Sequence, residues 1–250
     1  GVKKLKDTGR MAIIQNGSSL FTGDAGSGSS EIRRYIIEND RLEAIIQLPT
    51  DLFYNTGIAT YIWVVDGKNA KPLHRLGKVQ LIDASKCYVK SRKNIGNKRV
   101  DLDDKCIALI VKAYNGFEEK EYAEDGISVE SKILDNADFG YMRVTVETAQ
   151  VDSNGNKVLK KGKPIAEKGK TDTETIPLKD DINEYFKKNV LPYNPNAFME
   201  RTKDKVGYEI PFTRLFYKFV KPKDSDEIYK EIKELEKEEE TLMKELFGNE

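Results

Sequence analysis

The chain has 250 residues, of which 34% are charged and 38% hydrophobic, and its 42 Lys and Arg are balanced by 42 Asp and Glu. Because the net charge is zero, the overall charge balance points to no particular partner. No apolar run approaches the ~18–20 residues of a membrane span, so the sequence predicts a cytoplasmic protein without membrane attachment. Cys87, Cys106 and the single His74 fit no metal-ligand spacing, which predicts reduced thiols and no metal site.

Three apolar segments, residues 11–14, 42–48 and 60–65, predict strands of a sheet buried on both faces. Such strands need neighbours, and few residues precede the first one. The sequence therefore predicts that the chain begins inside an α/β domain. A fourth strand is expected at 78–83.

A glycine-rich loop follows the first strand. Gly23 and Gly28 have the G-x-x-x-x-G spacing of a phosphate-binding loop, but Ser29 stands where the phosphate-binding Lys belongs. The pattern favours a surface loop with Ser29 capping a helix whose buried face is Ile32, Tyr35 and Ile36. A nucleotide-binding protein is kept as an alternative.

The loop at 48–58 is the most specific signal in the chain. It connects two predicted buried strands, and the ends of strands are where α/β folds place ligands. It carries the adjacent aromatics Phe53 and Tyr54, followed by Asn55 and Thr56. Two interpretations remain open: the rings cap the sheet, or one of them stacks on a base.

Charge is unevenly distributed along the chain. Residues 68–99 hold ten basic residues and one acid, Asp83, whereas acids predominate from Asp224 onward. Such asymmetry is typical of regions with different partners. A solvated basic surface is the other interpretation of the basic span.

The second half contains two predicted helices before its last segment. Residues 106–114 have a helical stripe of Ile107, Ile110, Val111 and Tyr114, and Asn115-Gly116 is a stop signal. Asp180-Asp181 is expected to cap a second helix. The buried positions of that helix are expected to be Ile182, Tyr185, Phe186 and Val190.

The segments around that second helix have turn, strand and heptad patterns. Ser153-Asn154-Gly155-Asn156 predicts a hairpin turn within a polar stretch. Alternation of Tyr208, Ile210 and Phe212 predicts an edge strand or extended segment, because Pro211 cannot donate to a ladder. The last segment has a heptad seam with Glu239 as its polar break. A short helix of this kind needs a partner surface, on its own chain or on another subunit.

Several runs resemble the late part of adenine-N6 DNA methyltransferases, in particular the modification subunit of type I restriction–modification systems. The main ones are residues 9–21 (GRMAIIQNGSSLF), 31–34 (EIRR) and 48–60 (LPTDLFYNTGIAT). Further similar runs are residues 91–99, 138–141 and 205–214.

The resemblance implies an incomplete Rossmann-like methyltransferase sheet, its last strands only, followed by an α+β region and a terminal amphipathic helix. Residues 1–120 would complete the catalytic domain. Residues 121–222 would form an accessory region with a polar arm near 147–176, and residues 223–250 would dock on another subunit. The family's glycine-rich cofactor motif and Asn-Pro-Pro-aromatic motif lie upstream of these runs, and neither occurs here.

The resemblance thus implies a C-terminal fragment of a subunit that methylates adenine N6 in DNA with S-adenosylmethionine. We expect the fragment alone to have no catalytic residue of its own, to bind no cofactor and to be inactive. Its expected partners are DNA and the specificity subunit, with the restriction subunit as a further candidate. A non-enzymatic nucleic-acid-binding module is the first alternative.

Three sets of site residues follow from the resemblance. The base-pocket candidates, with Phe53 preferred for stacking on a flipped adenine and Tyr54 second, are Phe53, Tyr54, Asn55 and Thr56. The DNA-backbone candidates are Lys90, Arg92, Lys93, Lys98 and Arg99. The subunit-docking candidates are Ile228, Ile232, Leu235, Leu242 and Leu246.

Overall fold

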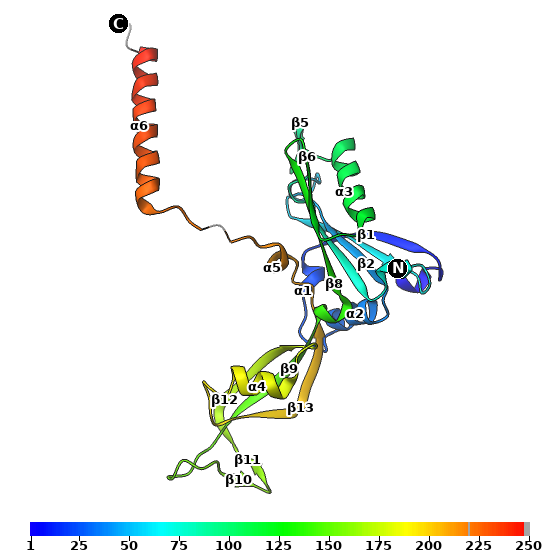
Figure 1. The fold of residues 1–250 in the computed structure, drawn as a ribbon, viewed down its shortest axis with the longest axis vertical. Helices are drawn as coiled ribbons and strands as arrows, with labels where there is room; N and C mark the ends of the chain where they lie inside the picture. The colour runs from blue at the N-terminus through cyan, green and yellow to red at the C-terminus, as the bar shows by residue number, and fades with distance from the viewer. Residues whose placement is uncertain (220, 248–250) are drawn as a thin grey trace. The chain divides into compact units, whose positions relative to one another are not determined.

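The computed structural model describes residues 1–219 and 221–247, and the chain divides into the units Gly1–Phe212 and Thr213–Glu250. The first unit contains a six-stranded sheet and a three-stranded sheet (Figure 1). The second contains the long helix α6 (Ser225–Phe247). In the part of the chain that is described, no helix combines the length and apolarity needed to cross a bilayer.

The six-stranded sheet is mixed, which confirms the predicted α/β class. Its order is β1-β3-β2-β4-β8-β7, with only β2 and β4 parallel. The strands are β1 (Arg10–Asn16), β2 (Leu42–Gln47), β3 (Thr60–Asp66), β4 (Lys78–Asp83), β7 (Lys120–Glu124) and β8 (Ile127–Asp135). The boundary expected at residue 120 follows α3 (Asp104–Gly116) and falls on the first residue of β7, which with β8 belongs to this same sheet.

Burial along the predicted strands differs from one strand to the next. β2 and β3 are buried along nearly their whole length, as predicted. β1 is not, since Ile13 is 39% and Ile14 50% exposed. The prediction of burial on both faces is wrong for β1 because it pairs with β3 and with no other strand of the described chain.

The helices α2 (Gly28–Glu38) and α3 are present, but each is rotated from its predicted orientation. On α2 the buried residues are Ser30, Arg33, Ile36 and Ile37, while Ile32 is 62% exposed. On α3 the buried residues are Cys106, Leu109, Ile110 and Ala113, while Ile107 and Val111 are about half exposed. Both sets on α3 have i, i+3, i+4, i+7 spacing, so periodicity alone does not choose between them. The observed face brings the small side chains of Cys106 and Ala113 against the sheet.

A hydrophobic cluster joins α3 to the sheet. Leu109 and Ile110 of α3 pack with Ile46 of β2, Ile82 of β4 and Val129 of β8. Full burial of such aliphatic side chains contributes about 1.5–3 kcal/mol each. This cluster lies under the end of β2 from which the predicted site loop departs.

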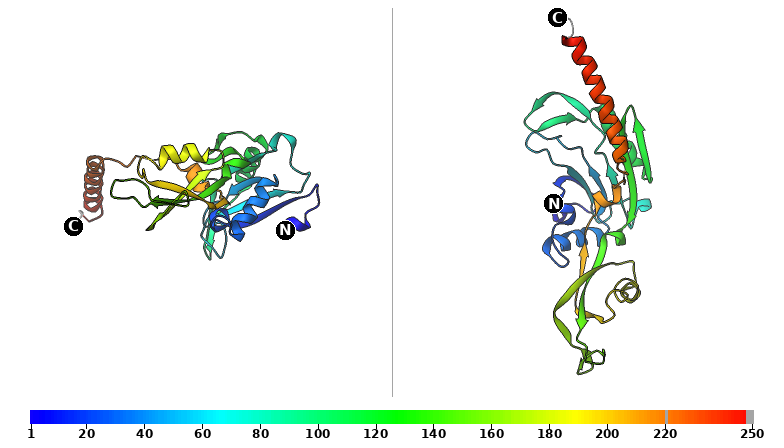
Figure 2. Two further views of the ribbon diagram at one scale, coloured as in Figure 1. Left: turned by 90° about the horizontal axis from the view of Figure 1, so that it is seen from below. Right: turned by 90° about the vertical axis from the view of Figure 1, so that its left-hand side faces the viewer.

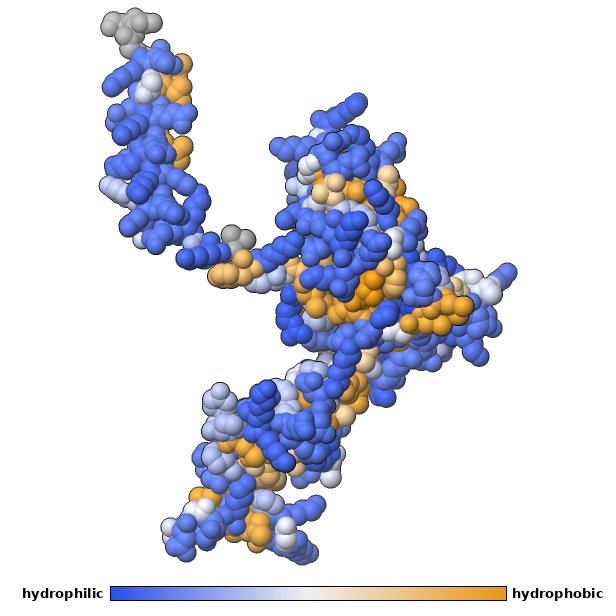
Figure 3. Space-filling model, in the orientation of Figure 1, coloured by the Kyte–Doolittle hydropathy of each residue, from blue (hydrophilic) through white to orange (hydrophobic). Residues whose placement is uncertain are grey.

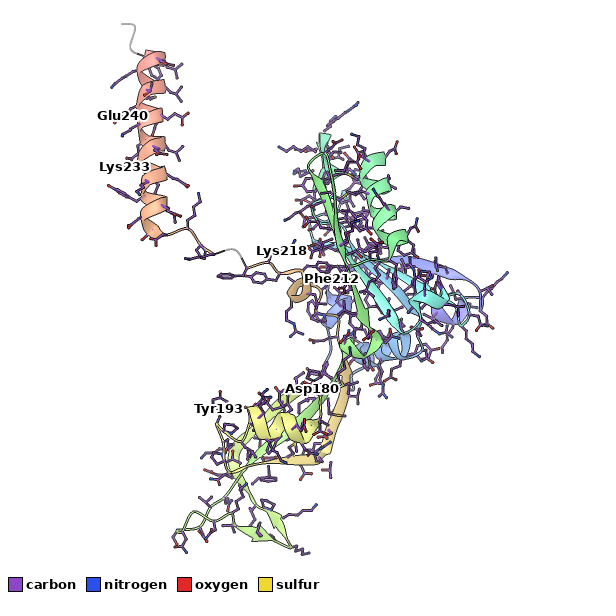
Figure 4. The ribbon with its side chains drawn as sticks, in the orientation of Figure 1. Asp180, Tyr193, Phe212, Lys218, Lys233 and Glu240 are labelled. Atoms are coloured by element: carbon purple, nitrogen blue, oxygen red, sulfur yellow. The ribbon has the colours of Figure 1, made fainter. Side chains whose placement is uncertain are left out.

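The three-stranded antiparallel sheet has the order β12-β9-β13. Its strands are β9 (Gly140–Ala149), β12 (Ala166–Pro177) and β13 (Ala197–Tyr208). Helix α4 (Ile182–Asn189) buries Phe186 against Val146 of β9. The Asp181 carboxylate accepts from the Glu184 amide at 2.9 Å, which confirms the predicted cap. Figure 4 labels Asp180 and Tyr193 on either side of this helix.

Arg33 joins α2 to the end of β13. Its buried guanidinium donates to the carbonyl oxygens of Tyr208, at 2.6 Å, and Thr22, at 2.9 Å. In addition, the Ser30 hydroxyl accepts from the Tyr208 amide at 2.9 Å. Burial of the guanidinium lowers the pKa of Arg33, and the charges of the nearby Tyr141 and Glu209 offset only part of this effect.

A buried charge network holds the opposite end of β2. Glu43 accepts from Arg75 at 2.8 Å and from the Tyr114 hydroxyl at 2.7 Å, and it also pairs with Arg10. Arg10 reaches the buried Asp66 of β3 at 2.7 Å. Burial raises the pKa of Glu43. The network therefore connects β1, β2, β3 and α3 through two carboxylates, Glu43 and Asp66.

We predict that Glu43→Gln lowers the free energy of unfolding by about 3 kcal/mol, because Arg75 would stay buried without its counter-charge. Urea unfolding at neutral pH measures this. The control is Lys105→Gln, which breaks the exposed pair of Lys105 with Asp125 and should cost less than about 1 kcal/mol. Equal effects of the two substitutions would contradict the prediction.

Candidate functional site

The loop between β2 and β3, residues 48–59, folds into a tight turn at the sheet end. Phe53 and Thr56 form an isolated antiparallel bridge, and the Asp51 amide donates to the Gly57 carbonyl at 3.2 Å. Asp51 itself has φ 57°, a left-handed conformation that Asp tolerates better than most residues. The turn thus presents residues 53–56 together.

The two aromatic rings of this loop have different surroundings. Phe53 is partly buried and packs on the hydrophobic cluster under α3. Tyr54 is 59% exposed, with the Lys98 ammonium 5.4 Å from its ring centroid. Asn55 is exposed and Thr56 half-buried. One ring is therefore fixed by the core, and the other is held only at the surface.

A second hairpin docks on this loop by its backbone. Strands β5 (Val89–Ile95) and β6 (Lys98–Asp101) form it beside α3 (Figure 1). The Asn97 amide donates to the Tyr54 carbonyl at 2.9 Å, and the Arg99 amide donates to the Asp51 carbonyl at 2.8 Å. The base-pocket and DNA-backbone candidates, about 40 residues apart in the sequence, therefore lie side by side. Its hydrogen bonds join main-chain groups, and the contact of Lys98 with the Tyr54 ring joins residues 44 positions apart, so no local pattern in the sequence signals it.

The basic side chains of this hairpin fall into two groups. Lys98 pairs with Asp101 at 2.6 Å, which lowers the pKa of Asp101, and Arg99 donates to the Gly96 carbonyl at 2.7 Å. The other three are exposed, and none of the described carboxylates is in ion-pairing distance of Lys90, Arg92 or Lys93. These three cations are available to an anionic ligand.

The glycine-rich loop at 23–28 does not form a phosphate cradle. Ser27, not the predicted Ser29, caps α2, its hydroxyl accepting from the Ser30 amide at 3.4 Å. A Cβ at Gly23 would collide with the Ser27 hydroxyl, so the loop is filled by its own side chain. Asp24 also pairs with Arg143 of β9 at 2.9 Å. In the described residues, no group of three or more His, Cys, Asp and Glu could hold a metal ion.

The heptad seam lies on α6. None of the residues of α6 is buried, and Ile228, Ile232 and Leu235 are 44–64% exposed. Figure 3 shows apolar side chains gathered along one side of an otherwise hydrophilic helix. Lys233 and Glu240, labelled in Figure 4, belong to its charged surface, and Lys233 pairs with Glu236 at 2.7 Å.

We predict that Gly96→Ala loosens the hairpin from the loop. Gly96 has φ 58°, and an added Cβ would collide with the Tyr54 carbonyl. Amide hydrogen exchange at Asn97 and Arg99 should therefore become faster.

The matched control is Gly155→Ala. Gly155 also has a positive φ, 80°, but its Cβ would meet nothing within 4 Å. Both substitutions carry the backbone cost of about 1–2 kcal/mol for a left-handed residue with a side chain. Unchanged exchange at Asn97 and Arg99 in Gly96→Ala would show that the docking does not depend on close approach there.

Comparisons with known proteins identify the family. The family model of N-6 DNA methylases matches residues 1–150. The methylase subunit of the type I restriction enzyme MjaIX of Methanocaldococcus jannaschii is 32% identical over 178 residues, which are 71% of this chain and 28% of that protein. The MpnII methylase subunit of Mycoplasma pneumoniae is 36% identical over 99 residues, 40% of this chain and 16% of that protein.

A solved structure is also similar. The methyltransferase subunit of a type I restriction–modification system from Streptococcus thermophilus has a TM-score of 0.42 and 27% identity, covering 52% of this chain and 24% of that chain. This chain spans less than a third of the length of each of these relatives. Since the family model matches more than half of its 250 residues, the chain belongs to the N-6 DNA methylase family.

Proposed function

We propose that these residues form part of a type I restriction–modification subunit that transfers a methyl group from S-adenosylmethionine to adenine N6 in DNA. The observation that carries the proposal is the docking of a basic hairpin on an aromatic loop at a sheet end, in a chain of the N-6 DNA methylase family. This arrangement suits a flipped base with its phosphate backbone alongside.

The described residues do not fit S-adenosylmethionine. The one glycine-rich loop is filled by Ser27, and the sequence contains no Asn-Pro-Pro-aromatic motif. In this proposal the cofactor and the adenine amino group are held by the rest of a longer subunit. What S-adenosylmethionine supplies when bound is the methyl group.

We also propose that further strands of a Rossmann-like sheet pack against β1. This strand exposes apolar side chains, and it borders a groove of about 460 Å³. Apolar side chains lining the groove include Met11, Ile13, Ile32, Ile36 and Trp63. An exposed apolar strand at a sheet edge is a surface that proteins normally cover or pair.

In the proposed complex Phe53 stacks on the extruded adenine. A stacking platform needs a ring fixed on one side and accessible on the other, and the half-buried Phe53 meets this requirement. Tyr54 is the second candidate, and Asn55 and Thr56 shape the pocket. Lys90, Arg92 and Lys93 contact the phosphates, whereas Lys98 and Arg99 hold the hairpin in shape.

We predict that Phe53→Leu in the whole subunit, assembled in its complex, lowers kcat/KM for methyl transfer by roughly 10-fold or more, because stacking is worth about 1–3 kcal/mol per base. Transfer of a labelled methyl group from S-adenosylmethionine to substrate DNA measures this. Duplex affinity should change far less. The 250-residue chain alone should transfer no methyl group.

Two controls separate stacking from packing. Phe53→Tyr keeps an aromatic face and should keep most of the activity. Tyr54→Leu should have the smaller effect. Full activity of Phe53→Leu would make Phe53 a hydrophobic cap of the sheet, and a larger loss in Tyr54→Leu would assign the stacking to Tyr54. Methyl transfer by the isolated chain would refute the proposal that it is only part of the enzyme.

We further propose that residues 223–250 dock on the specificity subunit through the seam of α6. The support is an exposed apolar stripe on a helix that buries none of its described residues, because helices in proteins gain most of their stability by packing an amphipathic face. Glu239 interrupts the stripe at a seam position. Two copies of α6 in register would bring two Glu239 carboxylates together, so a different partner helix fits better.

We predict that Leu235→Ala together with Leu242→Ala weakens binding of the subunit to the specificity subunit by roughly 100-fold. Each substitution should remove about 1.5 kcal/mol of the binding free energy that comes from burying the leucine side chain. Calorimetric titration measures the affinity. The matched control is Lys237→Ala with Lys244→Ala, two substitutions with the same seven-residue separation on the outer face of the helix. Equal affinities of the two double variants would exclude the seam as the docking surface.

A further inference from the structure

Between β9 and β12, an arm of residues 150–165 forms the middle of the polar stretch expected near 147–176. It begins with a bridge between Val151 and Lys157 around a turn. It continues with the small hairpin of β10 (Leu159–Lys160) and β11 (Lys163–Pro164). The arm extends from one end of the three-stranded sheet (Figures 1 and 2). None of its residues is buried, so it has no core of its own.

The arm and the start of β12 are strongly basic. Residues 150–170 contain six lysines and two acids, Asp152 and Glu167. Both acids already have partners within the segment. The Asp152 carboxylate accepts from the backbone amides of Asn154 and Asn156 at 2.9 Å, and Glu167 pairs with Lys170 at 2.9 Å. The acids therefore leave most of the positive charge of this segment uncompensated.

Four of the six lysines are exposed and form no ion pair with a described carboxylate, and the Glu200 carboxylate interacts with Lys163 only at longer range. Lys157 donates to the Ala197 carbonyl at 3.2 Å, and Lys170 is paired. None of the described carboxylates lies within ion-pairing distance of the remaining four. These are Lys160, Lys161, Lys163 and Lys168.

The hairpin places like charges directly opposite each other. Lys160 and Lys163 are register partners in the antiparallel pair β10–β11, and Lys161 occupies the turn between them with φ 50°. Like charges at opposed positions destabilise a strand pair, and a left-handed lysine adds backbone cost. A hairpin this short, with no buried residue, has little to offset these costs. A polyanion would remove the repulsion by neutralising all three ammonium groups.

We propose that this arm binds the phosphate backbone of duplex DNA, at a site separate from the β5–β6 hairpin. The proposal extends the proposed function, which supplies DNA as the polyanion. Backbone phosphates suit the arm because flexible lysines contact them without reading sequence. The expected role is therefore affinity and positioning on DNA, and not recognition of a target sequence.

The test is binding of the 250-residue chain to two duplexes of unrelated sequence, by fluorescence anisotropy over a series of salt concentrations. The variant replaces Lys160, Lys161, Lys163 and Lys168 with Gln. For both duplexes, its slope of log affinity against log salt should be less steep by about 3–4, since each neutralised phosphate contributes roughly 0.9. The control replaces four exposed lysines elsewhere, at positions 112, 187, 230 and 237, and should retain the slope.

Four results would overturn the proposal. The first is an unchanged slope in the arm variant, and the second is an equal change of slope in the control, which would indicate an effect of net charge alone. A parallel titration with polyglutamate gives the third: if the arm variant loses polyglutamate binding and keeps DNA binding, the arm binds an acidic protein. The fourth is the absence of DNA binding by the unaltered chain at low salt. Methyl transfer by the assembled complex is measured separately, so a negative result for DNA binding by the arm does not contradict the proposed function.

Discussion

The six-stranded sheet depends on one buried carboxylate. Glu43 lies on β2, the strand between β3 and β4, and it holds together side chains from β1, α3 and the segment before β4. Removing such a charge from water costs several kcal/mol, which is repaid only while every partner stays in place. The network is therefore intolerant of a change in strand register. It fixes one end of β2, and the hydrophobic cluster under α3 fixes the other.

That second end is where the candidate site forms. The loop leaving β2 derives its shape from backbone contacts with the β5–β6 hairpin, and its Phe53 ring rests on the same cluster that anchors α3. The stability of the sheet and the geometry of the site are thus supported by the same residues. In the proposed function this matters because a flipped base needs a platform that does not move when the base arrives.

The zero net charge of the chain conceals a division of charge between regions. Two basic hairpins, at 89–101 and 150–165, belong to the unit that ends at Phe212. The acidic α6 belongs to the other unit and also carries an apolar seam. DNA phosphates would suit the first two surfaces and a protein helix the third. In the proposed function, the first unit binds nucleic acid and the second binds a partner protein.

Local spacing and residue type were sufficient to predict the strands β1 to β4, the helices α2, α3, α4 and α6, the strong burial of β2 and β3, the cap at Asp181 and the resemblance that led to the family. They did not predict the strands β5 to β9 or the three-stranded sheet. The exposure of β1, the buried faces of α2 and α3, and the contact between the aromatic loop and the basic hairpin depend on packing between distant segments. Two overlapping helical stripes have the same periodicity, so packing partners must choose between them. The hydrogen bonds between the loop and the hairpin join main-chain groups, and nearly every residue type carries these groups, so no side-chain pattern encodes those bonds. Glu43 could have been recognised in the sequence as a member of a buried ion pair. A lone acid inside a buried apolar strand requires a cation nearby, and Arg75 is that cation.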